Sequence, residues 1–210
     1  MEDFLLSGRQ IRLEPLEQKH ADGLFAAARA DRSLYQWSPI PKDQEEVAAY
    51  IQTALHWKHA GTAAPFAIVR LSDGLVCGST RFWNLERWPW PRNHPSYGRD
   101  LPDACEIGHT WLGPWAIRTA ANTEAKLLML THAFETWQVL RVCLHTDVRN
   151  QRSRAAIERI GGKFEGILRA HRMAADFIPR DSARYSIVRP EWPAAKLRIS
   201  QRLESFFNAT

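Results

Sequence analysis

Cysteine is scarce in this 210-residue sequence, which has three cysteines and no C-x-x-C pair. Cys77, Cys105 and Cys143 lie far apart along the chain, and their number is odd. A disulfide framework uses an even number of cysteines, and a zinc site uses closely spaced pairs. We therefore expect buried free thiols, which suit a reducing compartment, and we predict a cytoplasmic protein.

Long apolar runs are also missing, because no stretch approaches the roughly 18 residues of a membrane span. The amino terminus begins with Met1-Glu-Asp and carries only a short apolar patch, unlike a signal peptide. Runs of five or six like charges are absent although the net charge is +5. We expect no membrane partner and no nucleic acid as the main partner. The positive excess fits either attraction to an anionic cofactor or an arginine-rich solvated surface.

No internal repeat, low-complexity tract or shift in composition divides the chain, so we predict a single domain over residues 1–210. Strand-like and helix-like apolar patterns alternate along it. The predicted strands cover residues 10–15, 65–71, 75–83, 104–112, 140–146, 163–169 and 183–188. The predicted helices cover residues 16–30, 43–59, 123–138, 150–161 and 191–206, and a long loop covers 87–101. This mixed order predicts an α+β fold around a largely antiparallel sheet.

The segment from 105 to 146 combines a strand, a loop of small residues, a helix and a second strand. This order is typical of a backbone cradle for phosphate, because the first N–H groups of a helix point at the anion. We interpret the N–H groups of residues 117–123, with the charge of Arg118, as a site for the pyrophosphate of a cofactor. The alternative is an ordinary strand–loop–helix connection that Asn122 caps.

Four phrases then follow in order: Glu106-Ile-Gly-His-Thr-Trp-Leu112, Arg118-Thr-Ala-Ala-Asn-Thr-Glu-Ala-Lys126, Asn150-Gln-Arg-Ser-Arg154 and Gly161-Gly-Lys-Phe-Glu-Gly166. Together they resemble the GNAT (GCN5-related) N-acetyltransferase superfamily, within it the ribosomal-protein N-terminal acetyltransferase (RimJ/RimL-like) branch. The resemblance implies a mixed, largely antiparallel sheet with helices on both faces and a C-terminal helix. It also implies acetyl-CoA as co-substrate without a metal, and direct attack by a primary amine of a protein N-terminus or a small molecule.

One loop departs from the pattern of that family. The family motif is Arg/Gln-x-x-Gly-x-Gly/Ala, whereas this chain has Ala120, Ala121 and Thr123 in the corresponding loop. Glycine allows positive φ and a close approach of phosphate, and alanine serves only where φ stays negative.

The resemblance also implies a set of cofactor-binding residues. The set contains Trp111, Leu112, Ile117, Arg118, Thr119, Ala120, Ala121, Asn122, Thr123, Asn150 and Ser153. A main-chain N–H near Leu112 would polarise the thioester carbonyl. Asn150 and Ser153 share one side of a helix start, where Asn150 would bind the pantetheine arm and Ser153 would protonate the leaving thiolate. Both residue types are also common in helix caps, and Tyr185 is a weaker alternative acid.

The acceptor must lose a proton, because an alkyl ammonium has a pKa near 10 and its amine attacks only when neutral. Glu106 is the first candidate base, with a structural hydrogen bond at a strand end as the alternative. Strand alternation predicts that Glu106 shares a face with Gly108 and Thr110, whereas His109 faces the opposite side. His171, expected in a loop after the strand at 163–169, is a further catalytic candidate or else a solvated loop residue.

Large aromatic residues are the candidates for the acceptor groove, namely Tyr35, Trp37, Trp83 and Trp88, although each equally suits the cover of a core. Six arginines indicate an acceptor that carries negative charge: Arg81, Arg87, Arg92, Arg99, Arg169 and Arg172. Two other functions stay open beside the enzyme, a non-catalytic acyl-CoA-binding or interaction module and a basic nucleic-acid binder. The terminal helix leaves open whether the chain forms a homodimer.

Overall fold

A computed structural model describes residues 3–208, which form one mixed sheet of eight strands in the order β1-β2-β3-β4-β5-β6-β8-β7. Every neighbouring pair is antiparallel except β5 and β6. The strands are β1 (Leu6–Ser7), β2 (Ile11–Pro15), β3 (Ala63–Arg70), β4 (Val76–Glu86), β5 (Ala104–Leu112), β6 (Arg141–Asp147), β7 (Lys163–Met173) and β8 (Pro179–Val188). The α+β prediction is confirmed, and β1 is an edge strand that the sequence patterns missed.

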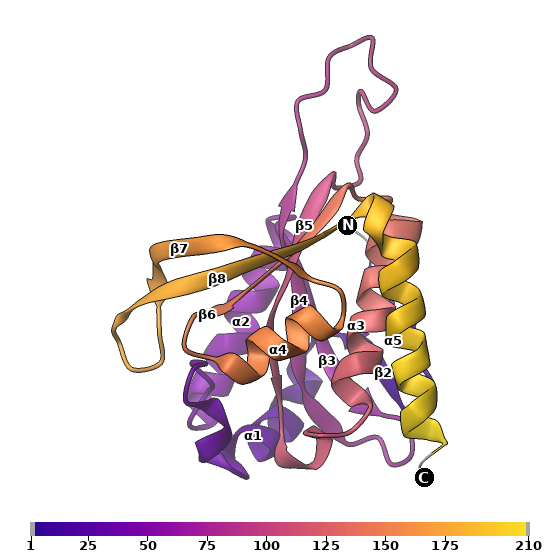
Figure 1. The fold of residues 1–210 in the computed structure, drawn as a ribbon. Helices are drawn as coiled ribbons and strands as arrows, with labels where there is room; N and C mark the ends of the chain where they lie inside the picture. Colours follow the sequence, from indigo (N-terminus) through magenta and orange to yellow (C-terminus); the bar gives the residue numbers. More distant parts are fainter. Residues whose placement is uncertain (1–2, 209–210) are drawn as a thin grey trace.

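Helices cover both faces of this sheet (Figure 1). They are α1 (Ala21–Arg29), α2 (Gln44–His59), α3 (Ala121–Thr131), α4 (Gln151–Arg159) and α5 (Trp192–Phe207). Strand β3 shows why two cores form, since alternate side chains of a strand point to opposite faces. Ala67 and Val69 pack in the core that holds α1 and α2, whereas Phe66 and Ile68 pack in the core that holds α3 and α5.

Strands β5 and β6 lie side by side only over a short distance. Their parallel register joins residues 104–106 to residues 141–143. From Ile107 onward, β5 has no recorded β6 partner among the described residues, while β6 continues along β8 as far as Asp147. The two strands therefore separate, and one edge of the β5 backbone keeps free hydrogen-bonding groups over residues 107–112.

A β-bulge interrupts β5 where the strands separate. Arg81 pairs with Gly108 and Ser79 pairs with Trp111, so His109 and Thr110 together oppose the single residue Thr80. His109 adopts a left-handed φ of 50°, as residues in bulges often do. The extra residue shifts the alternation of the strand by one position.

The bulge overturns the predicted faces of β5. The ring of His109 lies 5.0 Å from that of Trp83, which pairs with Glu106, so His109 and Glu106 share a face. Thr110 turns to the α3 side, where its hydroxyl lies 2.7 Å from that of Thr80. A bulge adds one residue to a strand, and the apolar–polar pattern of the sequence does not predict it. Alternation alone therefore gave the wrong faces.

Three further sequence predictions need correction. The strand expected over 183–188 begins earlier, at Pro179, and the β7–β8 hairpin turns at 174–178. His171 therefore lies inside strand β7 and not in a loop. The helix expected over 123–138 begins earlier and ends at Thr131, followed by a π-helical turn at His132–Thr136.

The segment between β4 and β5 has no helix or strand, as its prolines predict, and it projects from one end of the sheet (Figure 1). The Asp103 carboxylate accepts hydrogen bonds from the backbone N–H of Trp88 at 2.8 Å and from the indole of Trp90 at 2.9 Å. No helix among residues 3–208 has both the length and the apolar character to cross a membrane.

Candidate active site

Glu106 is the centre of a buried polar cluster that three strands assemble. Its side chain, on β5, is 4% exposed. The carboxylate Oε1 lies 3.0 Å from Nδ1 of His145 on β6, and Oε2 lies 3.4 Å from Nη2 of Arg172 on β7. These contacts form because β6 lies beside the first half of β5 and the long β7–β8 hairpin reaches over it.

A cavity of about 140 Å³ opens beside Glu106. It is lined by Asn84, Glu86, Cys105, Glu106, Cys143, His145, Leu168, His171, Arg172 and Arg184. Most of these side chains are polar, and two of them are imidazoles whose ring centroids lie 5.2 Å apart. The cavity therefore combines a carboxylate with two groups that can exchange protons.

The electrostatics of the cluster keep Glu106 ionised. Burial alone would raise the pKa of Glu106, but the His145 ring, the Arg172 guanidinium and the Trp83 indole outweigh burial and lower it. Burial lowers the pKa of His171, and the neighbouring Arg172 and His145 lower it further. At neutral pH the cluster thus presents an anionic carboxylate and a neutral His171 ring, which is able to accept a proton.

The bulge adds an aromatic wall to the same face. The Arg172 guanidinium lies 4.2 Å over the Trp83 ring, and the His109 ring lies 5.5 Å from that of Trp57 on α2. His109 is an exposed residue between these walls. Loss of hydration among these neighbours, and the charge of Arg81 and Arg172, lower the pKa of His109. His109 is therefore neutral in the working pH range.

The loop before α3 accommodates its alanines without backbone strain. Ala120 has φ −65° and ψ −19°, and α3 begins at the next residue. The left-handed position falls on Arg118 instead, with φ 64°. The Thr119 hydroxyl accepts a hydrogen bond from the N–H of Ala121 at 3.2 Å. Because φ stays negative at the alanines, the missing glycines do not distort this helix start.

The start of α3 also has backbone donors for a phosphate group. The first N–H groups of a helix have no partner within the helix. Asn122, expected as a possible cap, does not cap α3, and its Oδ1 is buried without a hydrogen-bond partner among residues 3–208. This orphaned oxygen is an acceptor, so it fits an amide N–H of the acyl-CoA that the sequence motifs imply.

Asn150 and Ser153, the pair predicted at the start of α4, have one atom engaged in capping the helix and two groups left over. The Asn150 Oδ1 accepts a hydrogen bond from the N–H of Ser153 at 3.0 Å, so this oxygen caps the helix. The Asn150 amide NH₂ and the Ser153 hydroxyl are left for other contacts. Tyr185, the alternative acid, is engaged elsewhere, because it donates to Glu158 at 2.9 Å and accepts from Arg154 at 3.0 Å.

Leu112 and Trp111 lie at the far end of β5 from Glu106. The Leu112 carbonyl accepts a hydrogen bond from the Tyr35 hydroxyl at 3.0 Å. The Trp111 ring packs 6.0 Å from that of Tyr35 and 6.4 Å from that of Tyr50. Leu112 therefore lies at the end of the unpaired edge of β5, and its hydrogen bond with Tyr35 holds its backbone in place.

The four predicted aromatic residues do not share one groove. Trp83 lies beside Glu106, whereas Tyr35 is 8% exposed and packs in the α1–α2 core. The Trp37 ring lies 4.5 Å under the Arg149 guanidinium. Trp88 lies at the other end of β5, where its indole donates to Glu86 at 3.2 Å. Trp83 is thus the one member of the four that the fold brings to the Glu106 cluster.

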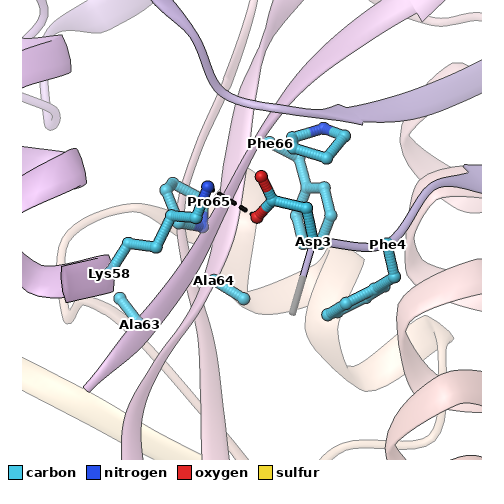
Figure 2. Close-up of a pocket in the computed structure, with 8 residues that line it drawn as sticks. Asp3, Phe4, Lys58, Ala63, Ala64, Pro65 and Phe66 are labelled. Carbon is cyan, nitrogen blue, oxygen red and sulfur yellow. Dashed lines mark ion pairs between the residues drawn. The ribbon is translucent and has the colours of Figure 1, made fainter. Parts of the chain in front are cut away.

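Sequence reasoning missed His145, which lies nearest to the Glu106 carboxylate. A histidine within the otherwise apolar run of β6 was the available signal, but the parallel register that joins Cys143 to Glu106 is a tertiary feature. A second, small hollow lies away from this cluster, beside the Asp3–Lys58 ion pair (Figure 2). It offers about 10 Å³ between apolar side chains, room for roughly one water.

Comparison with known proteins agrees with this geometry. The family model described as "Acetyltransferase (GNAT) domain" matches residues 10–163. The protein "Putative ribosomal N-acetyltransferase YdaF" of Bacillus subtilis (strain 168) is 29% identical over 126 residues, which are 60% of this chain. The match spans 61% of the length of that curated relative.

Solved structures share the fold over nearly the whole chain. A GCN5-related N-acetyltransferase from Brucella melitensis superposes with a TM-score of 0.79 at 30% identity, covering 97% of this chain and 86% of that one. Mycobacterium smegmatis RimJ in complex with CoA-disulfide gives a TM-score of 0.77 at 20% identity, covering 95% of each chain. At 20% identity, the similarity to M. smegmatis RimJ shows a shared fold and nothing more.

Proposed function

The chain belongs to the GNAT acetyltransferase family, and we propose that it transfers an acetyl group from acetyl-CoA to a primary amine by direct attack. The observation that carries this proposal is the buried, ionised Glu106 at the point where β5 separates from β6. The name of the B. subtilis relative, a ribosomal N-acetyltransferase, supports the ribosomal-protein branch and a protein N-terminus as one acceptor. A small-molecule amine is the other acceptor of the same class.

On this proposal Glu106 attracts the acceptor ammonium and takes its proton. His145 and Arg172 hold the carboxylate in place, since they contact its two oxygens at 3.0 and 3.4 Å. The neutral His171 ring receives the proton and passes it toward solvent. Removing the proton makes the amine a nucleophile.

The other strand edge and the two helix starts would hold the co-substrate. Acetyl-CoA supplies the activated thioester. The free N–H groups of residues 107–112 stabilise negative charge on a carbonyl oxygen. The N–H groups of residues 117–123 that have no internal partner, together with Arg118, would hold pyrophosphate. The Asn150 amide binds the pantetheine arm and the Ser153 hydroxyl donates a proton to the leaving sulfur.

We also propose that residues 1–210 act as one acyl-CoA N-acyltransferase domain and that the protein works in the cytoplasm. The continuous eight-stranded sheet, shared by every strand of residues 3–208, supports the first proposal. The three buried thiols support the second, because none of them forms a disulfide.

The test measures binding and turnover separately. Calorimetry with acetyl-CoA should give a Kd below the high micromolar range, and thiol release should follow with at least one member of a broad amine panel. Absence of binding would contradict the assignment of the α3 start. Binding without release across the panel would instead favour a non-catalytic acyl-CoA-binding module.

A further inference from the structure

Arg81 is a buried cation with no acidic partner among residues 3–208. It lies on β4, is 1% exposed, and is the largest fully buried side chain in the described part of the chain. Its guanidinium lies 4.8 Å from the Tyr50 ring and 5.3 Å from the Trp57 ring. Nε and Nη2 have no hydrogen-bond partner within residues 3–208, and no carboxylate of those residues pairs with the guanidinium.

The two aromatic rings contact this charge but give it no hydrogen-bond acceptor. Arginine keeps its proton in proteins, and burying an ion carries a penalty that contact with aromatic faces offsets in part. The donors Nε and Nη2 stay without an acceptor among residues 3–208. An anion from outside the chain would satisfy both the charge and these donors.

The position of Arg81 connects this missing anion to the Glu106 site. Arg81 pairs with Gly108, and Trp83, two residues along β4, pairs with Glu106. Glu106 and Arg81 are thus diagonal neighbours on one face of adjacent strands, where Cα atoms lie about 7–8 Å apart. The exposed His109 and the half-buried Tyr50, Trp57 and Trp83 lie around this pair of positions.

We propose that the acceptor carries a carboxylate a few bonds from its amine, and that Arg81 binds this carboxylate while Glu106 receives the amine. This inference rests on the proposed acetyl transfer at Glu106. A planar carboxylate matches the planar guanidinium, because its two oxygens can accept two parallel N–H···O bonds. Two acceptors share this chemistry: a free amino acid, through its α-carboxylate, and a peptide whose first residue is Asp or Glu, through its side chain.

The experiment compares acceptors that differ only in this charge. Thiol release from acetyl-CoA is measured with L-amino acids against their α-amides, and with tripeptide amides that begin with Asp or Glu against those that begin with Asn or Gln. Wild-type protein should prefer the carboxylate in one of the two sets by at least about thirtyfold in kcat/KM. The set that shows the preference identifies the acceptor class.

The variant Arg81→Gln assigns the preference to this residue. The discrimination should fall to within about threefold, and Arg198→Gln, which removes an exposed arginine of α5, should leave it intact. An equal rate with carboxylate and amide acceptors in wild type would overturn the inference. A preference that survives in Arg81→Gln would overturn it as well.

A binding measurement separates this inference from acetyl transfer itself. N-acetyl-amino acids, N-acetyl-peptides and their amide counterparts are titrated against wild type and Arg81→Gln, with tryptophan fluorescence and calorimetry as readouts. Tighter binding of the carboxylate forms to wild type alone supports the Arg81 site even where no acceptor is turned over. Turnover without any charge preference leaves acetyl transfer standing and removes the Arg81 assignment.

Folding of the variant is checked by its thermal midpoint and its Kd for acetyl-CoA. Because an unpaired buried charge destabilises a protein, Arg81→Gln and Arg81→Met should unfold no earlier than wild type. A lower midpoint together with unchanged discrimination would show that Arg81 supports the fold and does not bind the acceptor.

Discussion

Two buried cations, Arg81 and Lys126, lie on opposite faces of the β4–β5 strand pair. Both carry a charge into the protein interior, but their hydrogen bonds differ. Arg81 faces α2 and is 1% exposed, and Lys126 reaches from α3 and is 7% exposed. No carboxylate pairs with either of them among residues 3–208. Lys126 donates a hydrogen bond to the Thr110 hydroxyl at 2.7 Å, whereas Arg81 donates none from Nε or Nη2.

The difference lies in whether the charge can be removed. Burial lowers the pKa of Lys126 to about 7, so the amine can lose its proton and remain in an apolar core. The guanidinium of Arg81 cannot do the same. The α3 face therefore tolerates its cation without a partner, but the α2 face keeps a permanent charge beside Glu106 and the exposed His109. This contrast favours the α2 face as the side on which the proposed acceptor binds.

The largest expected effect is loss of turnover on the α2 face. Glu106→Gln keeps the shape of the side chain but removes the base, so kcat/KM should fall about 10²- to 10⁴-fold. The Kd for acetyl-CoA should stay unchanged, since Glu106 lies away from the α3 start. Steady-state thiol release and calorimetry check the two quantities.

Glu86→Gln is the matched control, because Glu86 lines the same cavity but binds the Trp88 indole. It should retain activity within a few-fold. Equal activity of Glu106→Gln and wild type would remove Glu106 from the chemistry and would break the assignment of the two faces.

The second prediction concerns the pH dependence of stability, which tests whether the buried Lys126 loses its proton. The Lys126 pKa is lowered from 10.5 to about 7 in the folded protein. Between these values the unfolded chain binds more protons, so burial of Lys126 makes stability rise with pH through this window. At 1.36 kcal/mol for each of about 3.5 units, the upper limit of this rise is about 5 kcal/mol.

Lys126→Met fills the same space without a charge and should remove this rise. Urea unfolding of wild type and variant at pH 7 and pH 10 gives the difference, in which the titration of all other groups cancels. Thiol release by Lys126→Met at pH 7 should remain near wild type. A variant with the same pH dependence as wild type would mean that Lys126 does not titrate in the core.

Much of the fold was predictable because apolar periods mark each long element. The strand predicted at 104–112 matches β5, and the helix predicted at 43–59 matches α2 after its Asp43 cap. These local patterns depend on neighbours in the sequence. The bulge at His109 does not, since it consists of one extra residue relative to a partner strand.

The candidate site was predictable only in part, for the same reason. Glu106 stood out as an acid in an apolar strand. His145 and Arg81 come to it through register with β6 and β4, which no single segment encodes. His171 was selected as a candidate, but its position in the Glu106 cavity depends on a hairpin longer than its polar residues indicated.

The next prediction, with a smaller expected effect, tests whether the co-substrate binds at the start of α3. Ala121→Glu places a carboxylate at the first position of α3, where it would compete with pyrophosphate for the same N–H groups. The Kd for acetyl-CoA should rise at least about tenfold, because two like charges a few Å apart repel each other. Since Ala121 is 4% exposed, the thermal midpoint of the variant is measured alongside to show that it folds. Ala121→Ser, small and neutral, should bind within about threefold of wild type. Unchanged affinity in Ala121→Glu would place the phosphate site elsewhere.

The last prediction, with the smallest expected effect, distinguishes a role in stability from a role in catalysis for Asn150 and Ser153 at the start of α4. Asn150→Ala removes the acceptor of the Ser153 N–H and should lower the free energy of unfolding by about 1 kcal/mol. Ser153→Ala keeps that backbone N–H and should leave stability within about 0.5 kcal/mol. If the Ser153 hydroxyl protonates the leaving sulfur, kcat falls in Ser153→Ala while urea unfolding is unchanged. Unaltered kcat would leave this helix start with its capping role alone, and the chemistry would then lie entirely on the α2 face.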